Sequence, residues 1–565
     1  TGNLYRPRGK AGPFPGILNP HGHWQKGRLE HQPLASIRAR CITFARMGMV
    51  AFSYDMVGYN DSLQVPAHRF VSLRGSLWGF TSLALQTWNS IRAIDFLQSL
   101  DDVDPQRIGC TGASGGGTQT FMVTAVEPRI KVAAPVNMIS AHMQGGCVCE
   151  NAPGLRTETY NVEIAALAAP RPMFIVSATG DWTVNTPTVE YPAIRSIYEL
   201  YGAGDKVATA QVQAEHNYNA ESRQYMYRWF ARWFLGDERL GIGAERDFIV
   251  EPDERMRVFP VGKLPAGTIR GFALEKAFKD GVQRRLDALL PSTSEKLEYL
   301  RKVTKTRLMH VLGATWPQPD TIIAEVGEIV QAEAWREQPV ALGRKGGNDR
   351  VPGTLYLPPG HSPTRMILAV HGTGREGLRD GFGGPGETIR ALLDAGFGVL
   401  ALDLFYIGAI PKEAAARNDH DWFWATFNPP LLGQRVQDIL TALAYLSRCE
   451  GSTSLALVGL GEGGPWSLLA AALSPLSCAV CVDLQAIPPE WDSVYLGSLY
   501  APLLRAYGDL RVAAALIAPR PLLLGNTAHR FPLTWSRAAY QVVGASGKLS
   551  EKPGPLTVRS LLSWL

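Results

Sequence analysis

The sequence predicts an α/β protein of two domains, each built on a doubly wound, mostly parallel sheet. The chain has 565 residues, well beyond the roughly 250 to 300 residues at which a single hydrophobic core stops growing. Short apolar runs alternate with helical patterns through both halves, and parallel strands require such crossovers. Four segments of the first half recur in the same order in the second half, which indicates an internal repeat.

Composition places the chain among globular proteins and excludes several classes of function. Hydrophobic residues make up 46% and charged residues 19%, with no low-complexity tract. The net charge is +5 and the basic residues are scattered, so no nucleic-acid partner is expected. The longest apolar stretch, 467–484, contains Pro475 and Asp483. It predicts a buried helix followed by a strand, and no membrane partner is expected.

The two copies match where predicted strands end. His21-Gly22 corresponds to His371-Gly372, and Asp55 corresponds to Asp403. The segment "RIGCTGASGGGTQTF" matches "LALVGLGEGGPWSLL", and "LAAPRPMFIVSATGD" matches "LIAPRPLLLGNTAHR". The repeat predicts one domain over residues 1–237 and a second over 349–565.

Between the copies, residues 238–348 are more charged and contain a helical pattern from about 274 to 311. We interpret this stretch as a connecting, partly helical segment. Seven cysteines show no paired framework, so most are expected to be buried thiols.

Residues 112–116, Gly-Ala-Ser-Gly-Gly, fit the G-x-S-x-G motif between an apolar strand and a helix. A nucleophilic serine in this motif stands on a turn so sharp that its neighbours must lack bulky side chains. A dinucleotide-binding turn would instead need G-x-G-x-x-G and an acid about 20 residues further on, and neither follows Ser114. The motif therefore predicts an α/β-hydrolase with Ser114 as nucleophile.

A serine nucleophile needs a base and an acid that orients the base, in the chain order Ser, Asp or Glu, His. Asp181 ends the strand "RPMFIVSATGD", and His216 precedes an aromatic amphipathic helix. Glu150 is a rival acid, because it lies in the loop after an earlier strand, and His142 is the rival base. We predict the triad Ser114, His216 and Asp181.

Two backbone donors are expected to hold the developing oxyanion. The residue after the nucleophile supplies one, the N–H of Gly115. The second is expected from "HGHW", with His23 ahead of Trp24. The two imidazoles of this segment raise the question of a metal, but no third ligand stands near them along the chain and the H-E-x-x-H helix is absent. We therefore expect neither a metal nor a cofactor.

The second copy lacks the corresponding residues. Gly461 stands at the nucleophile position, Arg530 stands at the position of Asp181, and no histidine follows His529. We predict a catalytically degenerate domain with a structural, substrate-binding or dimer-forming role. Its aromatic segment with Trp422 and Trp424 could contact a sugar, although packing at a domain interface is favoured.

The segments "RIGCTGASGGGTQT", "HGHW", "YDMVGYNDS" and "GDWTVNT" resemble those of bacterial acetyl xylan esterases and cephalosporin-C deacetylases. The likeness covers about residues 1–235, and tandem members of that family would extend it over the whole chain. It implies serine-dependent removal of small acyl groups, acetyl above all, from carbohydrate, and a secreted or periplasmic location. The sequence departs from the deacetylases at Gly115, where they carry Gln.

Several alternatives remain at this point. One is a glucuronoyl ester hydrolase, for which Arg156 is the nearest candidate cation, and another is a peptidase of the prolyl oligopeptidase type, although no β-propeller repeat occurs. A carbohydrate-binding pseudohydrolase is the non-enzyme alternative. Oligomeric state and acyl specificity stay open. The predicted pocket walls are Trp24, Tyr59, His142, Glu150 and Trp182.

Overall fold

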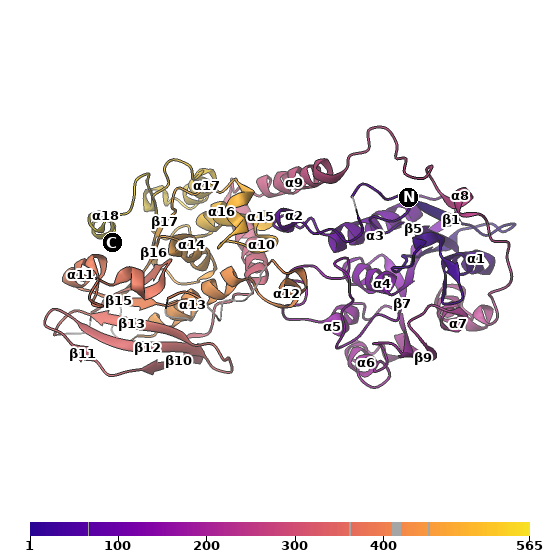
Figure 1. Ribbon diagram of the computed structural model, residues 1–565, viewed down its shortest axis with the longest axis horizontal. Helices are drawn as coiled ribbons and strands as arrows, with labels where there is room; N and C mark the ends of the chain where they lie inside the picture. The colour runs from indigo at the N-terminus through magenta and orange to yellow at the C-terminus, as the bar shows by residue number, and fades with distance from the viewer. Residues whose placement is uncertain (66, 361–362, 409–419, 450–452) are drawn as a thin grey trace. The chain divides into compact units, whose positions relative to one another are not determined.

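The computed structural model divides the chain into two compact units (Figure 1). It describes residues 1–65, 67–360, 363–408, 420–449 and 453–565. The N-terminal unit comprises residues 1–72 and 80–278, and the C-terminal unit comprises residues 73–79 and 279–565. The predicted boundaries at 237 and 349 do not coincide with these limits, because the predicted connecting segment is shared between the two units.

The N-terminal unit is built on a seven-stranded sheet in the order β1-β5-β2-β6-β7-β8-β9. Only the edge strand β1 runs antiparallel to its neighbour; the other pairs are parallel. The strands are β1 (Gly2–Tyr5), β2 (Phe14–Leu18), β5 (Val50–Tyr54), β6 (Val103–Ala113), β7 (Ile130–Val136), β8 (Met173–Gly180) and β9 (Val207–Glu215). A two-stranded ribbon, β3 (His31–Gln32) and β4 (Ala35–Ser36), lies outside this sheet.

Helices cover both faces of this sheet. On one face the buried core includes residues of α1 (Ile37–Met47) and α7 (Ala220–Phe230). On the other face it includes residues of α3 (Ser82–Gln98), α4 (Gly115–Val126), α5 (Asn161–Ala166) and α6 (Glu190–Leu200). The short helix α8 (Asp253–Met256) follows near the end of the unit. The carboxyl ends of the parallel strands therefore share one edge, where such folds place their sites.

The C-terminal unit repeats this strand order and adds antiparallel strands at one edge. Its sheet runs β10-β12-β13-β15-β14-β16-β17-β18-β19, with β11 paired to β12. The strands are β10 (Ile322–Val326), β11 (Val330–Gln331), β12 (Arg336–Arg344), β13 (Val351–Leu357), β14 (Arg365–His371), β15 (Phe397–Leu402), β16 (Ser454–Leu460), β17 (Ala479–Asp483), β18 (Leu522–Gly525) and β19 (Leu549–Lys552). The predicted mixed α/β class, with a mostly parallel sheet in each half, is confirmed.

Helices of the C-terminal unit also pack on both faces. Residues of α11 (Glu387–Asp394) and α18 (Val558–Trp564) join the core on one face, and α14 (Gly463–Leu473) packs against α13 (Leu431–Leu446) and α16 (Asp509–Leu516). The remaining helices are α2 (Leu73–Ser76), α10 (Ser294–Leu312), α12 (Trp422–Phe427), α15 (Leu504–Tyr507) and α17 (Thr534–Val542).

Two predictions about helices have different outcomes. The apolar stretch 467–484 does form a buried helix, α14, followed by strand β17, as expected. The single helical pattern over 274–311 is wrong, since α9 (Gly271–Asp287) and α10 are separate helices. Pro291 falls between them, and Thr293 starts α10 by accepting a hydrogen bond from the backbone N–H of Lys296. Among the described residues, no helix combines the length and apolarity needed to cross a membrane.

Candidate active site

Ser114 occupies the turn between β6 and α4 with φ of 59° and ψ of −130°. A non-glycine residue in this region costs roughly 1 to 3 kcal/mol, so the surrounding contacts must hold it there. A Cβ added to Gly112 or Gly116 would lie 2.6 or 2.5 Å from the carbonyl oxygen of Pro20. This crowding explains why glycines flank the serine.

The structure brings His216 and Asp181 together from the ends of adjacent strands β9 and β8. Nδ1 of His216 lies 3.2 Å from Oδ1 of Asp181, whose side chain is fully buried. The hydroxyl of Thr183 donates a hydrogen bond to the other carboxylate oxygen at 2.8 Å. Within the described structure, Nε2 of His216 has no hydrogen-bond partner. The carboxylate thus holds one ring nitrogen, and the other stays available to a further group.

Two tryptophans flank His216. The ring centroids of Trp182 and Trp24 lie 4.3 and 6.3 Å from that of His216. Trp24 also lies near Ser114. A Cβ added to Gly22 would lie 3.3 Å from the indole Nε1 of Trp24 and 2.9 Å from Cβ of Ser114. The elbow and the His216–Asp181 pair therefore border the same indole.

The two residues predicted to supply the oxyanion donors, Gly115 and His23, are in contact through the His23 side chain. A Cβ added to Gly115 would lie 2.9 Å from Cε1 of His23, so the imidazole packs directly on the residue after Ser114. His21, by contrast, is buried and bonded on both nitrogens, to the carbonyl of Gly22 and the N–H of Met56. Burial lowers the pKa of His21 to about 3, so it stays neutral and serves the packing of the loop.

The rival acid Glu150 has other partners than His216. Its carboxylate accepts a hydrogen bond from the backbone N–H of Cys147 and lies 3.9 Å from Nδ1 of His23. Burial raises its pKa. The rival base His142 is exposed and contacts the hydroxyl of Ser140 at 3.2 Å.

Tyr59, one of the predicted pocket walls, packs on the rings of His21 and His68.

A group of two thiols and two imidazoles surrounds Glu150, and sequence analysis missed it. One potential ligand atom from each of its four residues lies within 4.8 Å of the other three. We call it the thiol–imidazole cluster: His23, His68, Cys147 and Cys149. The expectation of no metal depended on finding no third ligand near the HGHW imidazoles along the chain. The fold brings three further potential ligands to one of those imidazoles, His23. The only signal in the sequence was the close spacing of the two cysteines.

The charges within the cluster influence one another. A hydrogen bond with Cys149 lowers the pKa of the Cys147 thiol, and the imidazoles of His23 and His68 lower it further. Burial opposes a charged His23, but hydrogen bonding to Cys147 and the charge of Glu150 together raise its pKa. The thiol of Cys147 and the imidazole of His23 therefore each favour the charged form of the other.

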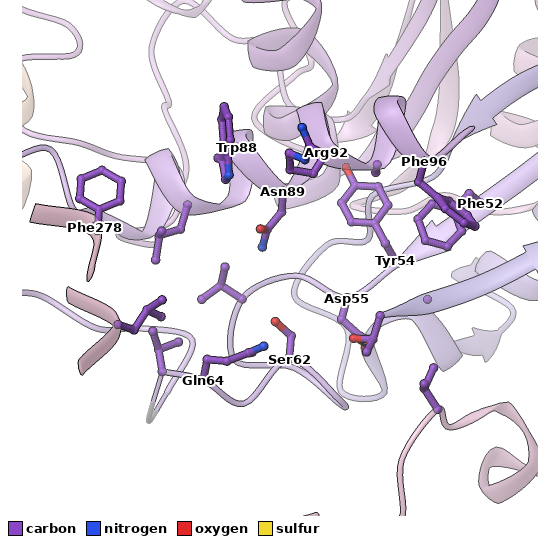
Figure 2. A pocket seen from close by; sticks show the side chains of 18 residues that line it. Phe52, Tyr54, Asp55, Ser62, Gln64, Trp88, Asn89, Arg92, Phe96 and Phe278 are labelled. Atoms are coloured by element: carbon purple, nitrogen blue, oxygen red, sulfur yellow. Dashed lines mark hydrogen bonds between the residues drawn. The ribbon is translucent and has the colours of Figure 1, made fainter. Parts of the chain in front are cut away.

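A cavity of about 740 Å³ lies elsewhere in the N-terminal unit, between β5 and α3 (Figure 2). Aromatic and aliphatic side chains line it together with polar ones such as Arg92 and Asp55. Phe52, Tyr54, Trp88, Phe96 and Phe278 are labelled in Figure 2. None of Ser114, Asp181 and His216 lines this cavity, so it is separate from the candidate active site.

Comparison with known proteins gives matches among esterases. Residues 2–147 match the model of the family "Glucuronyl esterase, fungi". The curated relative "Putative hydrolase YtaP" of Bacillus subtilis (strain 168) is 24% identical over 250 residues, which cover 40% of this chain and 81% of the relative.

Two solved structures extend this likeness. The methylesterase BT1017 is 32% identical with a TM-score of 0.43, and the match covers 51% of this chain and 64% of that one. The chain thus spans less than two thirds of that methylesterase. A family 15 glucuronoyl esterase from Caldicellulosiruptor kristjansonii is 18% identical with a TM-score of 0.32, over 44% of this chain and 77% of that one. The resemblance of the chain to carbohydrate esterases with an α/β-hydrolase fold is confirmed.

Proposed function

We propose that the N-terminal unit is a serine esterase that cleaves small esters of carbohydrate. Ser114 is the nucleophile, His216 the general base and Asp181 the acid that orients it. The observation that carries the proposal is the His216–Asp181 pair, which lies at the strand-end edge that also holds the Ser114 elbow. An imidazole held through Nδ1 by a buried carboxylate keeps Nε2 as the acceptor that a serine hydroxyl needs.

Ester cleavage then follows from the positions of these groups. His216 removes the proton of Ser114 as the serine oxygen attacks the ester carbonyl. The N–H groups of Gly115 and His23 stabilise the oxyanion, each donor being worth roughly 10² to 10³ in turnover. His216 then gives the proton to the leaving alcohol, which leaves the acyl group on Ser114. In the second step His216 removes a proton from water, the water oxygen attacks the acyl carbon, and the acid is released as Ser114 takes the proton back. In unliganded enzymes such contacts are often long, which is compatible with the absence of a Ser114–His216 hydrogen bond in the described structure.

Acetyl esters of sugars are the substrates we favour, since the motifs around Ser114 and His23 resemble acetyl xylan esterases. The match of residues 2–147 to the glucuronyl esterase model favours a second candidate, an ester of a uronic acid. A uronate substrate calls for a nearby cation. Arg156 does not suit this role, because it is buried and its guanidinium is bonded to Asn151 and Asn161. Arg69 suits it better, being exposed and close enough to lower the pKa of His23.

The test is a comparison of wild type with Ser114→Ala on p-nitrophenyl acetate, acetylated xylan and the methyl ester of glucuronic acid. Acetate release and methanol release are measured separately. Loss of both activities in Ser114→Ala supports a serine esterase, and the product released by wild type identifies the ester. Equal rates in the two proteins would remove the proposal and favour the carbohydrate-binding alternative.

A second measurement tests whether Arg69 binds a uronate substrate. Replacement by Ala is expected to raise KM for the uronate ester by about tenfold, as loss of one charged contact does, while KM for p-nitrophenyl acetate stays unchanged. Equal effects on both substrates would exclude Arg69 as a uronate-binding residue.

A further inference from the structure

We infer that the thiol–imidazole cluster binds one zinc ion beside the nucleophile elbow. Two thiolates and two imidazoles are the donor set of tetrahedral structural zinc sites. In such a site the four ligand atoms lie about 3.3 to 3.8 Å apart, given Zn–S and Zn–N bonds of about 2.3 and 2.0 Å. The ligand atoms here all lie within 4.8 Å of one another, so side-chain shifts of about 1 Å would close the site.

The histidines are already oriented as metal ligands are. Nδ1 of His68 donates to the carbonyl of Val57 at 2.6 Å, which leaves Nε2 unprotonated in the neutral ring. That Nε2 is buried and has no hydrogen-bond partner in the part of the chain that is described. A buried polar atom without a partner calls for an explanation, and coordination of a metal by this nitrogen would supply one.

His23 shows the second orienting arrangement. Its Nε2 lies 3.1 Å from Sγ of Cys149, and its Nδ1 faces the carboxylate of Glu150 at 3.9 Å. Ligand histidines commonly present their other ring nitrogen to a carboxylate, which fixes the ring and strengthens the donor. Glu150, which the sequence offered as a rival triad acid, fits this supporting role.

Ordinary buried cysteines in the same unit look different. Cys41 and Cys110 are fully buried, and among the described residues neither belongs to a group of potential metal ligands. Cys147 and Cys149 are likewise free thiols, but two imidazoles face them. Thiolate ligands favour zinc over magnesium or calcium, which prefer oxygen.

The ion would fasten three loops at the strand-end edge. Its ligands come from the segments after β2, β5 and β7, and His23 packs on Gly115 beside Ser114. Four protein ligands complete the tetrahedron, so the role is structural and no step of ester cleavage passes through the ion. The effect on catalysis rests on the proposed function; the metal site itself does not.

The test measures zinc on tag-free protein kept reduced, with bound metal first removed by a chelator. Wild type is expected to take up one zinc per chain and, with cobalt, to show a thiolate-to-cobalt absorption band. Cys147→Ala and Cys149→Ala should lose both, with affinity reduced beyond the roughly 10- to 100-fold typical of changes to supporting groups. Cys41→Ala is the matched control and should bind as wild type does.

Thermal unfolding keeps the test informative if a variant folds poorly. Zinc should raise the melting temperature of wild type and Cys41→Ala but not that of Cys147→Ala. Failure of wild type to bind zinc, or equal zinc in Cys147→Ala and Cys41→Ala, would overturn the inference. Ser114→Ala should bind one zinc whatever its activity, so failure of the esterase proposal is distinguishable from failure of the metal site.

Discussion

The two units share a strand order and differ in chemistry. The order β1-β5-β2-β6-β7-β8-β9 corresponds to β13-β15-β14-β16-β17-β18-β19. The residue between the central strand and its helix has φ of 59° at Ser114 and 56° at Gly461. The two elbow residues thus share a positive φ, but the one in the C-terminal unit has no side chain.

An ion pair follows the corresponding strand in both units. Asp55, at the end of β5, pairs with Arg28 at 2.6 Å, and Asp403, at the end of β15, pairs with Arg375 at 2.8 Å. The acid–base pair has no such counterpart, since Arg530 stands at the position of Asp181. Both units thus keep a positive φ at the elbow and an ion pair at the strand end, whereas the C-terminal unit does not keep the residues of the proposed triad. We propose that the C-terminal unit is a degenerate copy without hydrolytic activity.

Exchanging the elbow residues tests that proposal most strongly. Ser114→Gly should lower kcat by on the order of 10⁶, because no nucleophile remains. Adding Gly461→Ser to that variant should restore nothing, although a Cβ there would meet no atom closer than 3.6 Å. The measurement is p-nitrophenyl acetate hydrolysis by the single and double variants, and activity regained in the double variant would show that the C-terminal unit supplies a base.

The choice of acid gives the next largest effect. Asp181→Asn should lower kcat by roughly 10⁴, since the amide favours the wrong tautomer of the base. Glu150→Gln should change kcat less than about tenfold and weaken zinc binding by about 10- to 100-fold. Steady-state kinetics on both variants measures the two losses in kcat. A larger loss in Glu150→Gln would identify Glu150, and not Asp181, as the acid that orients His216.

The two ion pairs should differ in their contribution to stability. Arg28 is fully buried and also bonds Asp61, so Arg28→Ala leaves two carboxylates without their partner. We expect a loss of about 3 to 5 kcal/mol. Arg375 is 22% exposed, and Arg375→Ala should cost about 1.5 to 3 kcal/mol. Urea unfolding followed by fluorescence compares them, and equal losses would contradict the difference in burial.

A pH dependence of stability is also expected, and it is confined to the C-terminal unit. Burial raises the pKa of Asp438, in α13, to about 7, and its carboxylate accepts a hydrogen bond from the N–H of Phe405. The folded state therefore binds the proton more tightly than the unfolded state does. Its contribution to stability is complete below about pH 4 and disappears as the pH rises through 7, at about 1.4 kcal/mol per unit at most.

The control for this effect is Asp438→Asn, which cannot titrate. The difference in free energy of unfolding between wild type and Asp438→Asn should change between pH 4 and 7 and be constant above about pH 8. Urea unfolding at several pH values measures it. A difference that does not vary with pH would show that folding does not raise the pKa of Asp438.

Local features were well predicted from the sequence. The elbow around Ser114, the strands that end at Asp181 and the buried helix α14 followed by β17 all depend on neighbours along the chain. Spacing and glycine placement carry such information directly. The linker was less predictable, because the charged helices α9 and α10 share one apolar pattern and are separated only by residues 288–293, which include Pro291.

What the sequence by itself determined was therefore the α/β class and the order of the candidate triad residues along the chain. Only the tertiary structure decided which acid meets His216 and where Glu150 lies. It alone revealed the thiol–imidazole cluster, in which His23 and Cys149 are 126 positions apart. The physical reason is that a parallel sheet gathers the ends of non-consecutive strands at one edge, and side-chain directions there depend on packing that no linear spacing records.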